Sequence, residues 1–144
     1  MKKRITYVLI AVMMTLLLSG CGSSTSLKNG YYTAEMAEFS FDWKEYLIIQ
    51  VKNGIIVSAE YNAKNASGFI KSWDNSYMKN MINEQGTYPN KYTREYIQQL
   101  IDEQADTQVD AITGASTSGQ NFEKLVEAVL KQAAKGDSTT AIVE

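Results

Sequence analysis

The 144-residue chain contains no histidine, one cysteine and one proline. Without histidine, it has no Ser-His-Asp triad, no Cys-His nucleophile pair and no imidazole metal site. The single cysteine, Cys21, excludes an intramolecular disulfide. A chain with so few of the usual catalytic groups either takes its chemistry from a cofactor or performs none, so we predict neither a catalytic residue nor a metal site.

The N-terminal residues have the pattern of a secretory signal. Basic residues 2–4 precede an apolar run over residues 5–18, which is shorter than the roughly 20 residues that span a bilayer. Leu18-Ser19-Gly20-Cys21 then resembles the bacterial lipobox, whose cysteine is acylated and becomes the first mature residue. We therefore predict a lipoprotein signal peptide over residues 1–20 and a lipid on Cys21. An ordinary secretory signal with a chance cysteine is the alternative.

The charge balance argues against a nucleic-acid partner. Removing the signal leaves 11 basic and 16 acidic residues, a net charge of −5. Such a surface has no polybasic patch for nucleic acid or anionic lipid. We expect the lipid alone to hold the protein on the extracytoplasmic face of the cell membrane.

Hydrophobic patterning predicts a small single α+β domain over residues 30–135. Its antiparallel sheet is predicted to contain a strand near Tyr31, a β-hairpin around Asn53-Gly54 and a strand near Val109. The helical periodicity predicts three helices, at residues 72–84, 92–104 and 118–134.

The register of the hairpin follows from its apolar residues. A three-residue loop, Lys52-Asn53-Gly54, with Gly54 in the left-handed conformation, pairs apolar residues on one face, whereas a two-residue turn mixes apolar and polar partners. We therefore predict the bulged three-residue loop.

The segments outside the domain lack this patterning. Residues 21–29 are rich in serine and threonine and are predicted to be a flexible tether. Residues 136–144 follow a helix-stopping glycine and are predicted to be a loose tail.

The stretch from Asp110 to Gly119 is the credible place for chemistry. Its hexapeptide Thr113-Gly114-Ala115-Ser116-Thr117-Ser118 combines small residues with hydroxyls just before a predicted helix. The small residues leave the backbone accessible, and Ser116 offers an Oγ that can be esterified. The helix start favours a nearby anion by about 0.3–1 kcal/mol.

A helix cap and a P-loop are two other interpretations of this stretch. A plain helix cap formed by Thr117 or Ser118 needs no ligand and is the commoner structure. A P-loop is excluded, because the spaced Gly-Lys-Ser/Thr is missing. Elsewhere, Lys71, Trp73 and Tyr77 are candidates to approach a ring-shaped ligand, although aromatic residues at helical spacing are more often core.

The heptapeptide Asp110-Ala111-Ile112-Thr113-Gly114-Ala115-Ser116 resembles the flavinylation motif Asp-x-x-Ser/Thr-Gly-Ala-Thr/Ser of the FMN-binding domain family. This family includes the C subunit of sodium-pumping quinone reductase, the G subunit of the Rnf complex and small lipoproteins of extracytoplasmic electron transfer. The similarity extends over roughly residues 29–134 and is greatest to the single-domain lipoprotein branch.

The resemblance implies covalent FMN. In this family, a Mg²⁺-dependent FAD:protein FMN transferase moves the FMN moiety of FAD onto the last hydroxyl of the motif and releases AMP. Ser116 occupies that position and would carry the FMN through a phosphoester. The best-known members have threonine there, so Thr117 and Ser118 are alternative acceptors. The other motif positions are matched by Asp110, Thr113, Gly114 and Ala115.

Two roles follow from this resemblance. Asp110 repels a phosphodiester at short range, so we expect it to orient the turn or to be recognised by the transferase. The whole protein would shuttle electrons between redox partners at the membrane without turning over a substrate. The alternatives are a noncovalent flavin-binding, ligand-binding or sensor module, and a structural surface lipoprotein without a cofactor.

Overall fold

The computed structural model of the chain describes residues 26–104 and 109–144. The predicted signal peptide, Cys21 and most of the predicted tether lie outside the described residues. In the part described, no helix is both long and apolar enough to cross a membrane.

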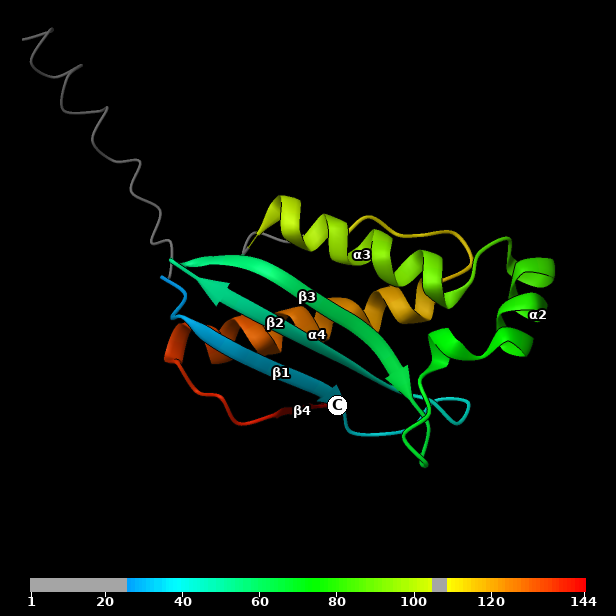
Figure 1. The fold of residues 1–144 in the computed structure, drawn as a ribbon, viewed down its shortest axis with the longest axis horizontal. Helices are drawn as coiled ribbons and strands as arrows, with labels where there is room; N and C mark the ends of the chain where they lie inside the picture. Colours follow the sequence, from blue (N-terminus) through cyan, green and yellow to red (C-terminus); the bar gives the residue numbers. More distant parts are fainter. Residues whose placement is uncertain (1–25, 105–108) are drawn as a thin grey trace, which may run out of the picture.

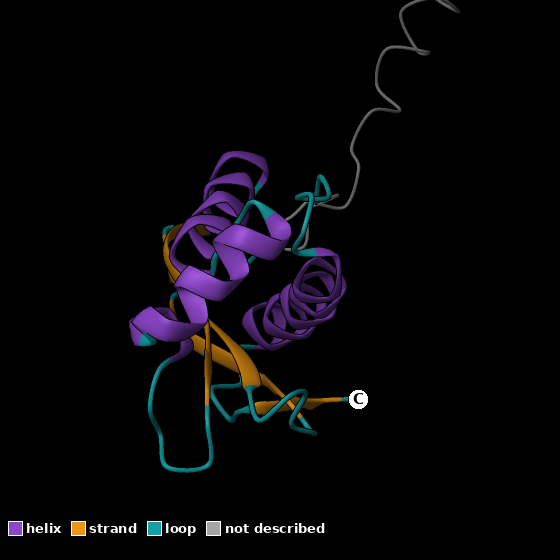
Figure 2. Cartoon of the chain, turned by 90° about the vertical axis from the view of Figure 1, so that its right-hand side faces the viewer, coloured by secondary structure: helices purple, strands orange, loops and turns teal. Residues whose placement is uncertain are grey.

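A four-stranded mixed sheet forms one layer of the domain, and the helices lie on one side of it (Figure 2). The strand order is β3-β2-β1-β4. Neighbouring strands β1, β2 and β3 are antiparallel, whereas β4 runs parallel to β1 at the edge. The strands are β1 (Gly30–Met36), β2 (Lys44–Lys52), β3 (Ile55–Lys64) and β4 (Ala141–Val143).

The helices are α2 (Asn75–Gln85), α3 (Pro89–Glu103) and α4 (Ser116–Lys135), and the 3-10 turn η2 (Lys71–Trp73) precedes them. Helix α3 packs on β3, and α4 packs on β1 and β2 (Figure 1). The Asp74 side chain caps α2 by accepting a hydrogen bond from the Tyr77 N–H at 2.9 Å. Gly86 and Gly136 end α2 and α4 in the left-handed conformation, which glycine adopts without steric cost.

Three aromatic rings join the sheet to the two longer helices at the centre of the core. Phe122 of α4 lies 4.7 Å from Tyr61 of β3 and 5.2 Å from Tyr96 of α3, between ring centroids. All three side chains are at most 1% exposed. Such aromatic pairs contribute about 0.5–1.5 kcal/mol beyond the area they bury, so this cluster stabilises the packing of α3 and α4 on the sheet.

The predicted small α+β domain is confirmed, and each predicted helix is present within a few residues of its predicted bounds. The strand predicted near Val109 is wrong. Val109 and Ile112 pack against the core without joining the sheet. The Gln99 side chain instead forms hydrogen bonds with both backbone groups of Asp110. The Asp110 N–H donates to Gln99 Oε1 at 2.7 Å, and Gln99 Nε2 donates to the Asp110 carbonyl at 3.3 Å.

The fourth strand comes instead from the segment predicted to be a loose tail. Ala141 and Val143 of β4 pack against the core, and Val143 pairs with Met36 of β1. The sheet is therefore mixed rather than antiparallel throughout. A segment of three residues is too short to show a strand pattern in the sequence. Its strand conformation depends on pairing with the free edge of β1.

The hairpin turn also differs from the prediction. Asn53 and Gly54 both have positive φ, 53° and 79°, and form a two-residue turn rather than a three-residue loop. The extra residue lies inside β3, where Val51 pairs with Ile56 but Gln50 pairs with Ser58. This bulge restores the apolar face that a regular two-residue hairpin would break.

Replacing Val143 with aspartate tests the position of β4. We expect Val143→Asp to lower the free energy of unfolding by about 1–3 kcal/mol, because it places a polar group against the core. The neighbouring Ile142 is 59% exposed, so Ile142→Asp is the control and should change stability by less than about 0.5 kcal/mol. Urea unfolding followed by circular dichroism measures both. Equal effects of the two substitutions would contradict the placement of this strand.

Candidate functional site

A cleft of about 470 Å³ lies at the end of the domain where β2 and α4 begin. We call it the Ser116 cleft. Its walls come from the loop before β2, from Lys71 and α2, and from the turn before α4. Its volume is within the range of roughly 300–1,000 Å³ typical of small-molecule sites. The described chain begins at the opposite end of the sheet (Figure 1).

The turn before α4 depends on Gly114. Its φ of +81° is strained for any residue with a side chain, and a Cβ there would lie 2.5 Å from the Gln85 carbonyl oxygen. Ala115 follows, 4% exposed, and its N–H donates to the Ile112 carbonyl at 3.0 Å. The sequence therefore brings the end of α2 and the start of α4 into contact at a position that only glycine fits.

Tyr96 of α3 holds the same turn from inside the core. Its hydroxyl accepts a hydrogen bond from the Ile112 N–H at 3.3 Å and donates to the Ala115 carbonyl at 3.4 Å. Burial raises the pKa of this phenol, so it stays neutral and keeps both roles at physiological pH. The turn is thus attached to the aromatic cluster of the core.

The three hydroxyls that follow the turn differ in their surroundings. Ser116 is the first residue of α4 and is exposed, as is Thr117. Ser118 is buried, and its Oγ donates to Glu45 Oε1 at 2.6 Å. Within the described residues, neither an ion pair nor a hydrogen bond engages the Ser116 hydroxyl.

The plain helix cap considered for Thr117 or Ser118 is not what the structure shows. The residue before α4 is Ala115, and no side chain caps the N-terminal N–H groups of this helix. Backbone donors of the first turn are therefore left for solvent or for an anion next to Ser116.

Glu45 lines the Ser116 cleft and is 8% exposed. Its carboxylate accepts hydrogen bonds from Ser118 Oγ and, at 2.7 Å, from Asn121 Nδ2. The Tyr61 hydroxyl donates to the Ser118 carbonyl at 2.7 Å. Burial raises the pKa values of Tyr61 and of the cleft-lining Tyr92, so both phenols are neutral.

Aromatic rings and one lysine line another part of the cleft. Trp43 and Tyr77 meet edge to face with ring centroids 6.1 Å apart. Lys71 Nζ lies 4.8 Å from the Tyr77 ring centroid and 5.9 Å from that of Trp43. These contacts form a partly apolar surface with a cation at its edge.

The loop that carries Trp43 is a tight turn with two strained residues. Ser40 and Trp43 exchange backbone hydrogen bonds of 2.8 and 3.0 Å. Between them, Phe41 and Asp42 have φ values of 48° and 68°, a conformation that costs roughly 1–2 kcal/mol for a residue with a side chain. Phe41 is 92% exposed and lines the mouth of the cleft.

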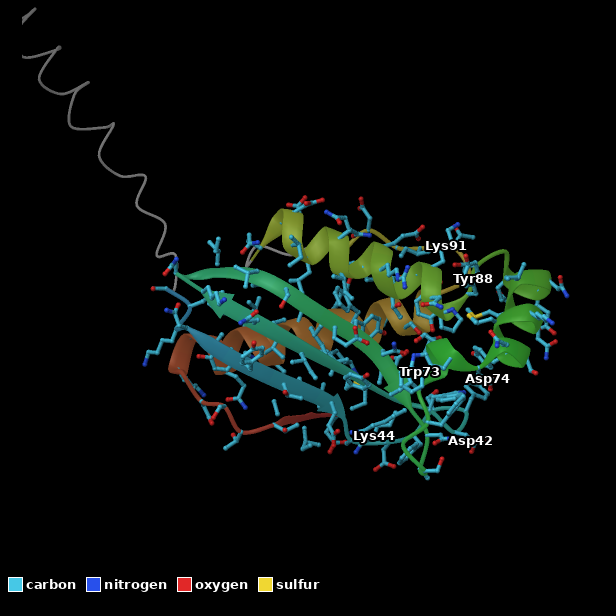
Figure 3. All side chains as sticks on the ribbon, in the orientation of Figure 1. Asp42, Lys44, Trp73, Asp74, Tyr88 and Lys91 are labelled. Atoms are coloured by element: carbon cyan, nitrogen blue, oxygen red, sulfur yellow. The ribbon has the colours of Figure 1, made fainter. Side chains whose placement is uncertain are left out.

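The structure separates the predicted site residues into two groups. Asp110 and Thr113 are exposed and do not line the cleft, whereas the residues from Gly114 to Ser118 do. Lys71 and Tyr77 line it as well. Trp73 is 65% exposed and packs edge to face on Phe69 outside the cleft, near the labelled Asp74 (Figure 3).

Sequence reasoning missed several residues that line the cleft, among them Phe41, Trp43, Glu45 and Tyr92. They come from a loop, a strand and a helix that only the tertiary fold brings together. One signal was available: a glutamate that interrupts the apolar face of a strand indicates a buried partner.

Comparison with known proteins gives relatives along nearly the whole chain. No protein-family model matches. The 15 kDa lipoprotein of Treponema pallidum (strain Nichols) is 32% identical over 133 residues, which is 92% of this chain and 94% of that protein.

Two solved structures are similar. The crystal structure of the CPE2226 protein from Clostridium perfringens has a TM-score of 0.77 and 36% identity, over 81% of this chain and 97% of that one. A solution structure from Clostridium thermocellum has a TM-score of 0.50 and 28% identity, over 74% and 92% of the two chains.

Gly114→Ala and Gly86→Ala form a matched pair that tests the turn. Both glycines have positive φ, but an added Cβ meets backbone at Gly114 and open space at Gly86. We expect Gly86→Ala to cost about 1–2 kcal/mol through its conformation alone. Gly114→Ala should cost at least about 1 kcal/mol more, because α2 and α4 must move apart. Denaturant unfolding measures both, and equal losses would contradict the close contact.

Proposed function

The chain belongs to the family of the 15 kDa lipoprotein of Treponema pallidum, and we propose that it is a membrane-anchored lipoprotein that carries covalent FMN and passes electrons between redox partners. The observation that carries this proposal is the position of Ser116. Its exposed hydroxyl stands at the first residue of α4, beside a cleft with aromatic walls. It also occupies the acceptor position of the flavinylation motif that the sequence resembles.

The start of α4 fits a phosphoester on Ser116. The first-turn N–H groups have no side-chain cap, and the helix dipole favours an anion there. Gly114 and Ala115 add no bulk in front of the hydroxyl, so a transferase has access to it. Ser118 is a poor acceptor, because it is buried and already donates to Glu45. This supports Ser116 as the acceptor and leaves Thr117 as the second choice.

The Ser116 cleft also fits a flavin ring. Its volume of about 470 Å³ suits a ligand of this size, and Trp43 and Tyr77 would contact the ring. When bound, FMN supplies one- or two-electron transfer, which the side chains of this protein do not supply. Trp43, Tyr77 and Met81 would exclude water from part of the ring, and Lys71 and Glu45 would act on it through their charges.

The position of the cleft suits exchange with partners. Cys21, the proposed lipid attachment site, precedes the first described residue, Ser26, by five positions. The start of the described chain lies at the far end of α4, where the Lys28 N–H donates to the Ala133 carbonyl at 2.9 Å, whereas Ser116 begins that helix. A chain anchored at Cys21 on the extracytoplasmic face would therefore leave the cleft open to redox partners and to the FMN transferase.

Mass spectrometry of protein coexpressed with an FAD:protein FMN transferase tests the acceptor. We expect the mass of one FMN moiety on the peptide that contains Ser116, and loss of this adduct in Ser116→Ala. Thr117→Ala removes the neighbouring exposed hydroxyl and should keep the adduct, so it is the matched control. An adduct that persists in Ser116→Ala and disappears in Thr117→Ala would move the site by one residue.

The same preparations separate the other functions. A yellow protein that loses its flavin on denaturation, without a mass adduct, would indicate noncovalent binding. A colourless protein of unmodified mass, from cells with an active transferase, would contradict flavin binding and favour a structural lipoprotein.

Labelling cells with a palmitate analogue tests the anchor. We expect label on the wild-type protein and its loss in Cys21→Ser, because a thiol at this position is the acyl acceptor. Cys21→Ser should also move the protein from the membrane to the soluble fraction. Equal labelling of the two proteins would contradict lipid attachment at Cys21.

A further inference from the structure

Lys71 is the only buried lysine among the residues that the structure describes. It is 9% exposed, lies in η2 and lines the Ser116 cleft. Its ammonium lies near the rings of Trp43 and Tyr77. The residue is buried as a whole, but Nζ is not among the fully buried unpaired atoms of the described residues, so the ammonium reaches the open cleft.

The Lys71 ammonium has no acceptor. Throughout the described ranges, it makes neither an ion pair nor a hydrogen bond with protein. Lys44 and Lys64, in contrast to Lys71, each form an ion pair with Glu35 at 2.9 Å. These two contacts lower the pKa of the Glu35 carboxyl. An ammonium carries three donors, and the faces of two rings leave those donors unused.

Glu45 does not supply the missing acceptor, although it lines the same cleft. Both of its oxygens already accept hydrogen bonds, one from Ser118 and one from Asn121. Lys71 and Glu45 therefore both line the cleft without pairing with each other. The Lys71 ammonium has no acceptor in the described protein and faces the open cleft, so an anionic group that occupies the cleft is its natural partner.

We propose that Lys71 pairs with the ring of the bound flavin and raises its reduction potential. The inference rests on the proposed function. Lys71 stabilises the single negative charge that the ring holds once it has accepted two electrons from a redox partner and one proton from water. The ammonium interacts less favourably with the neutral oxidised ring, and this difference favours reduction.

The ring is favoured over the phosphate as the partner of Lys71. The phosphate would be tied to Ser116, where the uncapped N–H groups of α4 are its donors. Lys71 instead lies between the two aromatic side chains that suit a planar ligand. A role at the phosphate predicts a different result in the experiment below.

The experiment compares Lys71→Met, Lys71→Arg and Lys79→Met in the full chain, coexpressed with the transferase. Intact mass measures FMN loading, and equilibration with redox dyes measures the midpoint potential. At a fixed potential, we expect Lys71→Met to lower the ratio of reduced to oxidised flavin roughly tenfold, which is about 30 mV for a two-electron couple. Lys71→Arg keeps the charge and should remain close to the wild-type potential.

Lys79→Met is the matched control for charge. Lys79 is exposed on α2, so its removal changes the net charge equally but acts through solvent and salt. We expect it to leave the midpoint potential unchanged. An equal shift in Lys79→Met and Lys71→Met would overturn the proposal, because it would show a general charge effect.

A second measurement needs no flavin. In the Ser116→Ala background, Lys71→Met should lower the free energy of unfolding only slightly, because it removes two cation–π contacts and no hydrogen bond or ion pair. A large loss of stability would assign Lys71 to the fold and overturn the proposal.

The remaining outcomes are distinct. Reduced loading of Lys71→Met with an unchanged potential would assign Lys71 to the phosphate or to the transferase and would overturn the proposal. Full loading with an unchanged potential would also overturn it, while the proposed function stands. A wild-type protein without FMN would overturn both.

Discussion

The hydrogen bond between Glu45 of β2 and Ser118 of α4 determines how the start of α4 is presented. It is 2.6 Å long and buried, and the Tyr61 hydroxyl holds the Ser118 carbonyl from the neighbouring strand. Successive helical residues are about 100° apart, so residues two apart point in nearly opposite directions. Because Ser118 faces the sheet, Ser116 faces outward. The contact that anchors one hydroxyl therefore exposes the other.

Close packing extends this constraint through the core. A Cβ on Gly119 would lie 2.5 Å from the Tyr96 hydroxyl, so α3 and α4 approach each other as closely as a glycine allows. The Tyr96 hydroxyl also forms hydrogen bonds with the turn before α4. At Gly114, this turn lies against Gln85 at the end of α2. The motif is thus attached to three helices. Its small residues allow close packing against α2 and α3 and also leave the Ser116 hydroxyl accessible.

Sequence patterning predicted what depends on local periodicity, and little that depends on pairing between distant segments. The helix that ends at Lys135 has a regular apolar stripe, so its bounds were predictable. Val109 has the propensity of a strand, but the Gln99 side chain takes the backbone groups that a strand would need. The motif identified Ser116 and its neighbours from local sequence. The cleft beside Ser116 also includes Trp43 and Glu45. These two residues reach the cleft only because β2 pairs with β1 and β3 in the sheet.

The charges of the cleft and the proposed covalent link support each other. A ligand held by diffusion must gain its binding free energy from contacts, which favours enclosed and well-paired sites. A tethered flavin has no such requirement, because its local concentration is set by the bond to Ser116. The side chains around it are then free to act on the ring rather than to retain it. Lys71 without a protein acceptor, a buried Glu45 and an exposed Phe41 at the cleft are compatible with such a site.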